Sequence, residues 1–190
     1  KKIGLTDLHC SVLGLGCLHF SVYLDEKQSD QLVNHSIDKG INFFDTGPLY
    51  GNGNSQKILG KILKNKRNDN IISTKAGLEK EIRPDGSFGV KVEKLTPIYL
   101  RKSLENSLKQ INTDYIDLFQ LHAFDESTPL EETIGEVDNL YNEGLIRAFG
   151  VSNYNPIQLK KINELLKGSN IKNLAAIESH YNLIERKIET

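Results

Sequence analysis

Apolar positions recur with a helical period in five parts of the chain. In three of them a polar residue and a proline come first, which is typical of an N-cap followed by proline at the first helical position. These pairs are Thr96-Pro97, Thr128-Pro129 and Asn155-Pro156. Glu131 is placed to complete a capping box with Thr128. The expected helices cover about 28–39, 55–64, 96–111, 128–144 and 155–168.

Short apolar runs lie between these helical segments and suit buried strands. The expected strands are Val12–Cys17, Asn42–Asp45, Ile71–Lys75, Tyr115–His122, Ile146–Val151 and Ala175–Glu178. Strands that alternate with helices at this spacing indicate βαβ units and a parallel sheet. Residues before the first strand could form a short hairpin. The polar stretch 79–95 is expected to be a working loop over one end of the sheet.

The number of units leaves two architectures open. Six βα-type units are enough for a doubly wound sheet. A (β/α)8 barrel needs two more units and typically takes about 250 residues. We treat residues 1–190 as a single domain, since no linker or low-complexity segment divides them.

Composition narrows the class of protein. With 24 basic and 25 acidic residues the chain is nearly neutral, so nothing marks it as a nucleic-acid binder. No apolar run approaches the roughly 18 residues of a membrane span. Cys10 and Cys17 fit neither a metal site nor a disulfide framework, so we expect a cytoplasmic location.

The strands end on polar or ionisable residues. These are Asp45, Lys75, His122, the pair Ser152-Asn153, and Glu178. Tyr50 follows Asp45 by five residues, in the segment "INFFDTGPLYG". Each residue alone is usually structural, as a turn cap or a solvated charge. Together they are expected at the carboxyl ends of parallel strands, where ligands bind in such folds.

These side chains suggest proton transfer to a carbonyl oxygen. A tyrosine has a pKa near 10, and a neighbouring lysine ammonium lowers it by favouring the phenolate. Asp45 would keep Lys75 charged, and His122 would orient a substrate oxygen. We find no obvious nucleophile and no metal-ligand cluster. The partner reaction is therefore expected to be hydride delivery from a bound cofactor.

Six segments give the chain a resemblance to the aldo-keto reductases, in the order and spacing of that family. They are "LGLGC" (13–17), "NFFDTGPLYGNGNSQKILGKIL" (42–63), "IISTKAG" (71–77), "SLKQINTDYIDLFQLH" (107–122), "GLIRAFGVSNYN" (144–155) and "AAIESHYNLIER" (175–186). The resemblance implies a (β/α)8 barrel preceded by a β-hairpin, NADPH as the cofactor and reduction of an aldehyde or ketone. Tyr50 would be the general acid, Lys75 and Asp45 its tuning pair, and His122 the residue that orients the carbonyl.

The resemblance also assigns residues that face the cofactor. They are Gly16, Cys17, Asp45, Ser152, Asn153 and Glu178. Ser152 and Asn153 would hold the nicotinamide carboxamide, while Tyr50 and His122 would contact the substrate. Glu178 departs from the family, which usually carries glutamine there. A carboxylate accepts a hydrogen bond from the carboxamide but cannot donate one unless protonated.

A second departure is the number of units, about six of the expected eight. The segments that would stack on the nicotinamide and bind the adenosine phosphate have no counterpart here. No residue in the sequence therefore supports a preference for NADPH over NADH. An open barrel would expose two strand edges, so we expect the chain to be part of a longer protein. A cofactor-binding redox sensor and a nonfunctional truncated product remain alternatives. The sequence predicts neither the substrate nor the oligomeric state.

Overall fold

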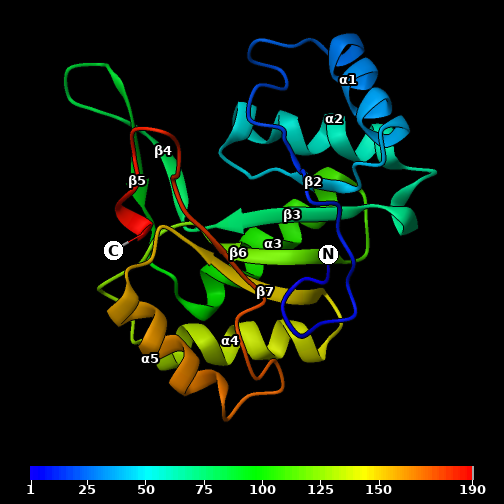
Figure 1. Ribbon diagram of the computed structural model, residues 1–190. Coiled ribbons are helices and arrows are strands. Elements are labelled where there is room, and N and C mark those ends of the chain that lie inside the picture. The colour runs from blue at the N-terminus through cyan, green and yellow to red at the C-terminus, as the bar shows by residue number, and fades with distance from the viewer. Residues whose placement is uncertain (190) are drawn as a thin grey trace.

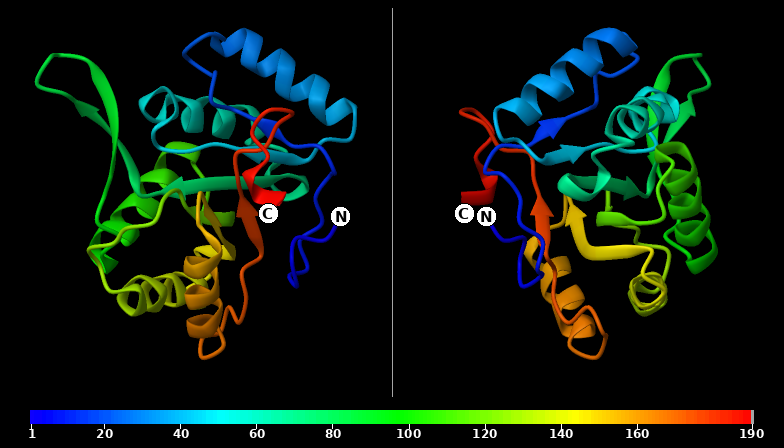
Figure 2. Two further views of the ribbon diagram at one scale, coloured as in Figure 1. Left: turned by 60° about the vertical axis from the view of Figure 1, so that its left-hand side comes forward. Right: turned by 90° about the vertical axis from the view of Figure 1, so that its right-hand side faces the viewer.

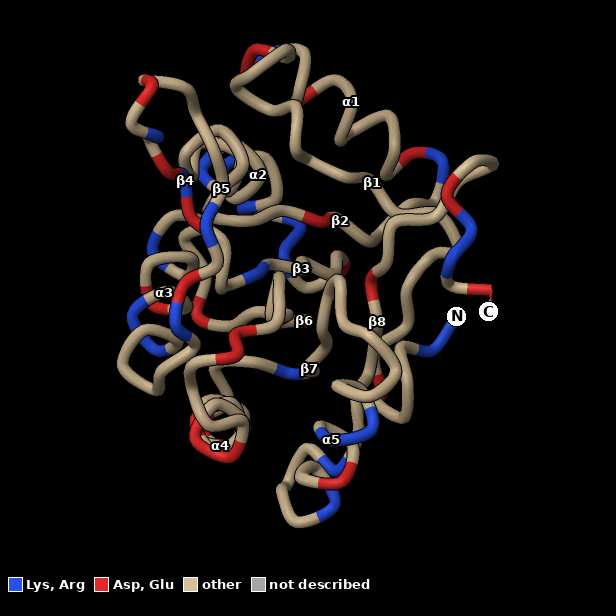
Figure 3. The backbone as a smooth tube through the Cα atoms, turned by 90° about the vertical axis from the view of Figure 1, so that its left-hand side faces the viewer, with Lys and Arg blue, Asp and Glu red and all other residues tan. Residues whose placement is uncertain are grey.

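Six parallel strands lie side by side in one curled sheet. The computed structural model describes residues 1–189 (Figure 1). Its strand order is β1-β2-β3-β6-β7-β8, and these strands are labelled in Figure 3. The strands are β1 (Leu15–Gly16), β2 (Phe43–Asp45), β3 (Ile71–Ala76), β6 (Ile116–Leu121), β7 (Ile146–Ser152) and β8 (Ala176–Glu178). Seen along the strands, the sheet curves around a central space with helices outside it (Figure 3). This is the arrangement of an incomplete (β/α)8 barrel, which decides between the two predicted architectures.

Five helices cover the outer face of the sheet. They are α1 (Glu26–Asp38), α2 (Asn54–Leu63), α3 (Pro97–Ile111), α4 (Leu130–Asn142) and α5 (Pro156–Leu166). Their apolar stripes pack against the strands and bury Leu59, Leu104 and Val137 together with Phe119 and Phe149. All five predicted helices are confirmed. None of the helices within residues 1–189 combines the length and hydrophobicity that crossing a membrane requires.

The helix caps follow the sequence at two of the three polar–proline pairs. Thr96 accepts a hydrogen bond from the backbone N–H of Tyr99, and Asn155 forms a full capping box with Gln158. The capping box predicted at Thr128 and Glu131 is wrong. Helix α4 begins at Leu130 without a side-chain cap.

The hydroxyl of Thr128 donates instead to Asp125, with 2.5 Å between the oxygens. Asp125 also accepts hydrogen bonds from Ser127 and from the backbone N–H of Leu95. The loop before α4 is thus organised around this carboxylate, which holds Thr128 away from the helix end.

The stretch predicted as a loop contains two further strands. β4 (Leu78–Ile82) and β5 (Phe88–Val92) pair in an antiparallel hairpin that projects from the body of the molecule (Figures 1 and 2). One face of the hairpin is apolar and exposed, with Phe88 66% and Ile82 71% accessible. The sequence signal was present as period-two alternation on both sides of a Pro-Asp-Gly turn.

The predicted N-terminal hairpin is present in reduced form. Lys2 and His9 make an isolated antiparallel bridge. Two backbone hydrogen bonds support it, from Ile3 N–H to Leu8 at 2.9 Å and from Cys10 N–H to Lys1 at 2.7 Å. Gly4 approaches the backbone of Ala175 so closely that a Cβ there would lie 2.7 Å from it.

Helices α2 and α3 meet through a glycine. A Cβ on Gly60 would lie 2.0 Å from the carbonyl oxygen of Ile111, so only glycine permits this approach. One turn earlier on α2, the buried amide of Gln56 donates to Thr74 of β3 at 2.8 Å and to Ser107 of α3 at 2.9 Å. These contacts fix α2 against both the sheet and its neighbouring helix.

Candidate active site

The carboxyl ends of the strands bring most of the predicted site residues to one rim. Lys75, on β3, is completely buried and lies at the centre of the group. Its ammonium is ion-paired with both carboxylate oxygens of Asp45 at the end of β2, with Nζ 2.5 Å from Oδ1. The carboxylate of Glu178, at the end of β8, lies 3.4 Å from the same nitrogen. Three strands thus contribute to one ionic cluster.

Tyr50 reaches the cluster from the turn after β2. Lys75 Nζ donates to the phenol oxygen at 3.4 Å and lies 5.2 Å from the ring centroid. The turn continues through Gly51, whose φ is 56°, and a Cβ at that position would meet the carbonyl oxygen of Phe20 at 2.9 Å. Glycine is therefore required next to Tyr50 for the chain to turn here.

Burial raises the pKa of Tyr50, and the ammonium of Lys75 offsets only part of that rise. We expected Lys75 to lower the pKa. Its contribution has the expected sign, but the net shift of the pKa is upward. Burial disfavours the charged phenolate by more than the nearby ammonium favours it. Burial alone would lower the pKa of Lys75, but Asp45 raises it above its ordinary value. The pair thus consists of a neutral phenol beside a charged ammonium.

His122 completes the group at the end of β6. Its ring lies edge-on to that of Tyr50, with 6.2 Å between the centroids. Burial, together with the nearby ammonium of Lys75, lowers the pKa of His122 to about 4. The imidazole is therefore neutral near pH 7 and can donate one hydrogen bond and accept another.

Ser152 and Asn153 lie beside this group at the end of β7. The Asn153 amide donates to the Ser152 hydroxyl and to the backbone carbonyl of His122, each at 3.0 Å. The backbone N–H of Asn153 donates to the carbonyl of Glu178 at 3.0 Å. Asn153 has a left-handed φ of 63°, which asparagine tolerates better than most residues. These bonds join the ends of β6, β7 and β8.

A glutamine that the sequence analysis missed connects the cluster internally. The buried amide of Gln120, on β6, donates to Ser73 and to Glu178, both at 2.9 Å. Its carbonyl oxygen is buried without a hydrogen-bond partner among residues 1–189. The signal was a polar residue within the apolar strand "YIDLFQL", two positions before His122.

Gly16 and Cys17 lie at the edge of the rim, at the end of β1. A Cβ on Gly16 would meet nothing within 4 Å, so the backbone there faces open space. Cys17 is fully buried, and burial together with the negative charge of Asp45 strongly raises the pKa of its thiol. It is a packing residue rather than a reactive thiol.

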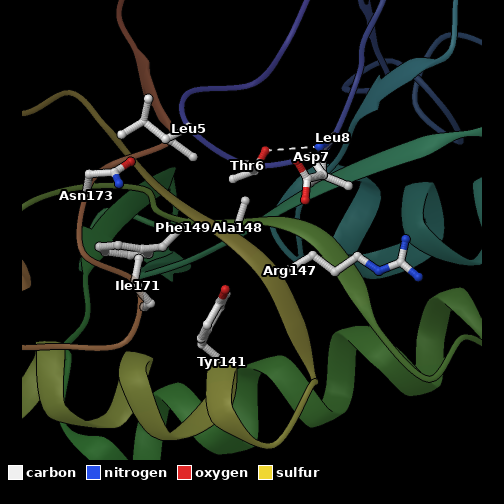
Figure 4. A pocket seen from close by; sticks show the side chains of 11 residues that line it. Leu5, Thr6, Asp7, Leu8, Tyr141, Arg147, Ala148, Phe149, Ile171 and Asn173 are labelled. Atoms are coloured by element: carbon white, nitrogen blue, oxygen red, sulfur yellow. Dashed lines mark hydrogen bonds between the residues drawn. The ribbon is translucent and has the colours of Figure 1, made fainter.

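A separate cavity lies at the opposite end of the strands. It has a volume of about 520 Å³ and is lined by the N-terminal segment, the start of β7 and the end of α4 (Figure 4). Leu5, Tyr141 and Arg147 are among the side chains that line it. It contains none of the predicted site residues.

Comparisons with known proteins identify the family of the chain. The sequence profile of the Aldo/keto reductase family matches residues 12–190. The chain belongs to the aldo-keto reductase family. Among curated relatives, this aldo-keto reductase is 35% identical to the "Uncharacterized oxidoreductase YqkF" and 35% identical to the "Aldo-keto reductase YhdN", both of Bacillus subtilis. It spans 58% and 55% of the lengths of these two proteins, and they cover 100% and 99% of the chain.

Solved structures of the family have the same fold. The glycerol dehydrogenase AKR11B4 from Gluconobacter oxydans matches with a TM-score of 0.84 at 33% identity, over 99% of this chain and 57% of its own. The holo form of the aldo-keto reductase AKR11C1 from Bacillus halodurans matches with a TM-score of 0.83 at 35% identity, over 100% of this chain and 59% of its own. The chain spans less than two thirds of the length of each of these solved proteins.

Proposed function

We propose that this chain carries the proton-transfer centre of an NADPH-dependent reductase that converts an aldehyde or ketone to an alcohol. The observation that carries the proposal is the contact of 3.4 Å between the buried Lys75 ammonium and the Tyr50 oxygen, with Asp45 paired to the same ammonium. A neutral phenol held by a fixed positive charge can donate its proton and is then stabilised as a phenolate.

Tyr50 donates its proton to the carbonyl oxygen of the substrate. The cofactor, when bound, supplies the hydride that reduces the carbonyl carbon. As the phenol loses its proton, Lys75 stabilises the negative charge that forms on Tyr50. Asp45 keeps Lys75 protonated in a buried place, where an unpaired ammonium would be costly. His122, neutral near pH 7, donates a hydrogen bond that orients the carbonyl oxygen.

The residues at the rim have the chemistry that a nicotinamide carboxamide requires. Ser152 and Asn153 offer hydroxyl and amide groups, and Glu178 offers an acceptor for the carboxamide N–H. The open space over Gly16 leaves room for a cofactor to approach the backbone. The choice of NADPH follows the family resemblance. The matched glycerol dehydrogenase supports a small alcohol and its carbonyl partner as the substrate class. Two free cysteines support a cytoplasmic location.

Substitution of Tyr50 tests the proposal. The purified protein is assayed for loss of NADPH absorbance with a panel of aldehydes and ketones. We expect Tyr50→Phe to reduce turnover by about 10²- to 10⁴-fold, the range for loss of a positioned general acid. Tyr141→Phe serves as the matched control, because it removes the same hydroxyl at the opposite end of the strands.

Three results would contradict the proposal. An unchanged rate in Tyr50→Phe would remove the phenol as proton donor. Binding of NADPH without turnover of any carbonyl would favour the alternative of a redox-sensing subunit. Absence of both binding and turnover would favour a nonfunctional product.

A further inference from the structure

We infer that Glu178 makes this site bind the oxidised cofactor in preference to the reduced one, through its negative charge. The inference rests on the proposed function, because it concerns the same cofactor at the same rim. One ammonium lies between two acidic side chains, Asp45 on one side and Glu178 on the other.

The position of Glu178 is built into the sheet. Its backbone pairs with Ser152 across the β7–β8 ladder and accepts a hydrogen bond from Asn153. Its side chain accepts from Gln120 at 2.9 Å and lies 3.4 Å from Lys75. A glutamine in its place could keep the acceptor toward Gln120 but would carry no charge. The charge is therefore the property that distinguishes the carboxylate.

The cluster holds more negative than positive charge. Lys75 is matched by the closer carboxylate of Asp45, and the neutral groups around it, Tyr50 and His122, supply no second cation. Burial raises the pKa of Asp45, Lys75 offsets part of that rise, and the carboxylate of Glu178 adds to it, as expected for two acids that share one ammonium. One negative charge thus remains uncompensated at the rim.

This charge lies where the cofactor can respond to it. The side chain of Glu178 is 45% exposed while its carboxylate lies 3.4 Å from Lys75, so its charge is accessible from solvent at the rim. A nicotinamide ring is cationic when oxidised and neutral when reduced. A nearby carboxylate attracts the cationic ring more strongly than the neutral one, so it favours the oxidised form.

The same charge acts on the proton donor. Burial is the main cause of the raised pKa of Tyr50, and Glu178 adds to it by repelling the phenolate. Oxidation of an alcohol requires this phenolate as a base. Replacing Glu178 with glutamine should therefore weaken binding of the oxidised cofactor and, separately, shift the pH dependence of alcohol oxidation to lower pH.

Isothermal titration calorimetry of the purified protein with NADP+ and with NADPH tests the inference. We expect Glu178→Gln to raise the ratio of the NADP+ to the NADPH dissociation constant by about tenfold, which corresponds to loss of one charge a few ångströms away in a half-exposed site. The change should shrink as salt is added, because salt screens the charge. Glu164→Gln, on the exposed face of α5, removes the same charge away from the rim and should leave the ratio unchanged.

The outcomes separate this inference from the proposed function. A tenfold rise in Glu178→Gln alone, reduced by salt, supports the inference. An unchanged ratio, with both cofactors still bound, overturns it and leaves carbonyl reduction intact. A wild-type protein that binds neither cofactor overturns the proposed function and the inference together.

Discussion

Two ion clusters lie at opposite ends of the same strands and have opposite compositions. At the rim, one ammonium (Lys75) lies between two carboxylates. At the other end, one carboxylate (Asp117) lies between two guanidinium groups. Arg67 pairs with it at 2.7 Å and Arg147 at 3.3 Å.

Each residue of the second cluster makes further contacts with neighbouring protein groups. Asp117 also accepts a hydrogen bond from the backbone N–H of Ile72 at 3.0 Å. Both arginines lie over the ring of Tyr115, at 4.1 Å and 3.6 Å from its centroid. Arg67 donates in addition to the carbonyls of Asn70 and Tyr115.

The difference shows how the same kind of interaction can serve structure at one end and chemistry at the other. Asp117, on β6, connects this strand to β3 through the N–H of Ile72 and to β7 through Arg147. Its carboxylate is thus bound by protein groups. Lys75 instead contacts the phenol of Tyr50 at 3.4 Å and the carboxylate of Glu178, whose side chain is 45% exposed. We therefore expect substitutions at Asp117 to affect stability and substitutions at Lys75 to affect turnover.

The largest expected effect is on turnover, at Lys75. Lys75→Met removes the charge that stabilises the phenolate of Tyr50, so we expect carbonyl reduction to fall by about a thousandfold. Lys57→Met, on the exposed surface of α2, is the control and should retain the wild-type rate. Steady-state kinetics with circular dichroism to confirm folding would check this, and near-normal turnover in Lys75→Met would contradict it.

Asp117 should give the complementary result. Asp117→Asn leaves Arg67, which is only 14% exposed, without its ionic partner. Breaking a buried pair from one side is costly, so we expect the free energy of unfolding to fall by about 3 kcal/mol. Turnover per folded molecule should change less than about twofold, since Asp117 touches none of the rim residues.

Urea denaturation measures the loss of stability at Asp117. Asp114→Asn, an exposed residue three positions earlier, is the matched control and should leave the unfolding midpoint in place. A stable Asp117→Asn protein with impaired turnover would contradict the structural role assigned to the Asp117 cluster.

The smallest expected effect is a dependence of stability on pH at the rim. The pKa of His122 is about 4 in the folded chain, below its ordinary value of 6.5. As the pH falls below about 6.5, the unfolded chain takes up a proton that the folded chain does not, so stability declines until about pH 4 and then levels off. We expect this to cost about 2 kcal/mol.

Unfolding curves between pH 7 and pH 4 check this dependence, and His122→Asn should flatten it. Although burial opposes the shift, hydrogen bonds from Thr128 and Ser127 lower the pKa of Asp125 to about 2. The loss of stability due to protonation of Asp125 therefore occurs below pH 4, outside the pH range used for His122. A His122→Asn protein with the same pH dependence as the wild type would assign the effect to another group.

The sequence predicted the parts of the fold that local pattern determines. Apolar periodicity placed all five helices and six parallel strands, and Thr96 and Asn155 cap their helices as expected. It failed at Thr128, because Asp125 binds that hydroxyl through a loop whose shape depends on tertiary contacts. It also missed β4 and β5, whose alternating residues were attributed to a polar loop.

The sequence likewise indicated part of the candidate site. Strand ends indicated Asp45, Lys75 and His122, since parallel strands deliver their last residues to one rim. Gln120 was missed, because nothing in a single strand shows that its amide bridges to Glu178. The direction of the pKa shift of Tyr50 could not be predicted from the sequence either. Burial and charge act in opposite directions, and their balance depends on the folded geometry.

The glycine contact between α2 and α3 has a consequence for how this chemistry can change. Tyr50 lies in the turn that leads into α2, and Gln56 fastens that helix to Thr74, the neighbour of Lys75 along β3. We therefore expect the separation of phenol and ammonium to depend on the position of a helix on the outside of the barrel. We expect a methyl group added at Gly60 to change the distance between the Tyr50 oxygen and Lys75. No residue proposed to contact substrate or cofactor would itself be altered.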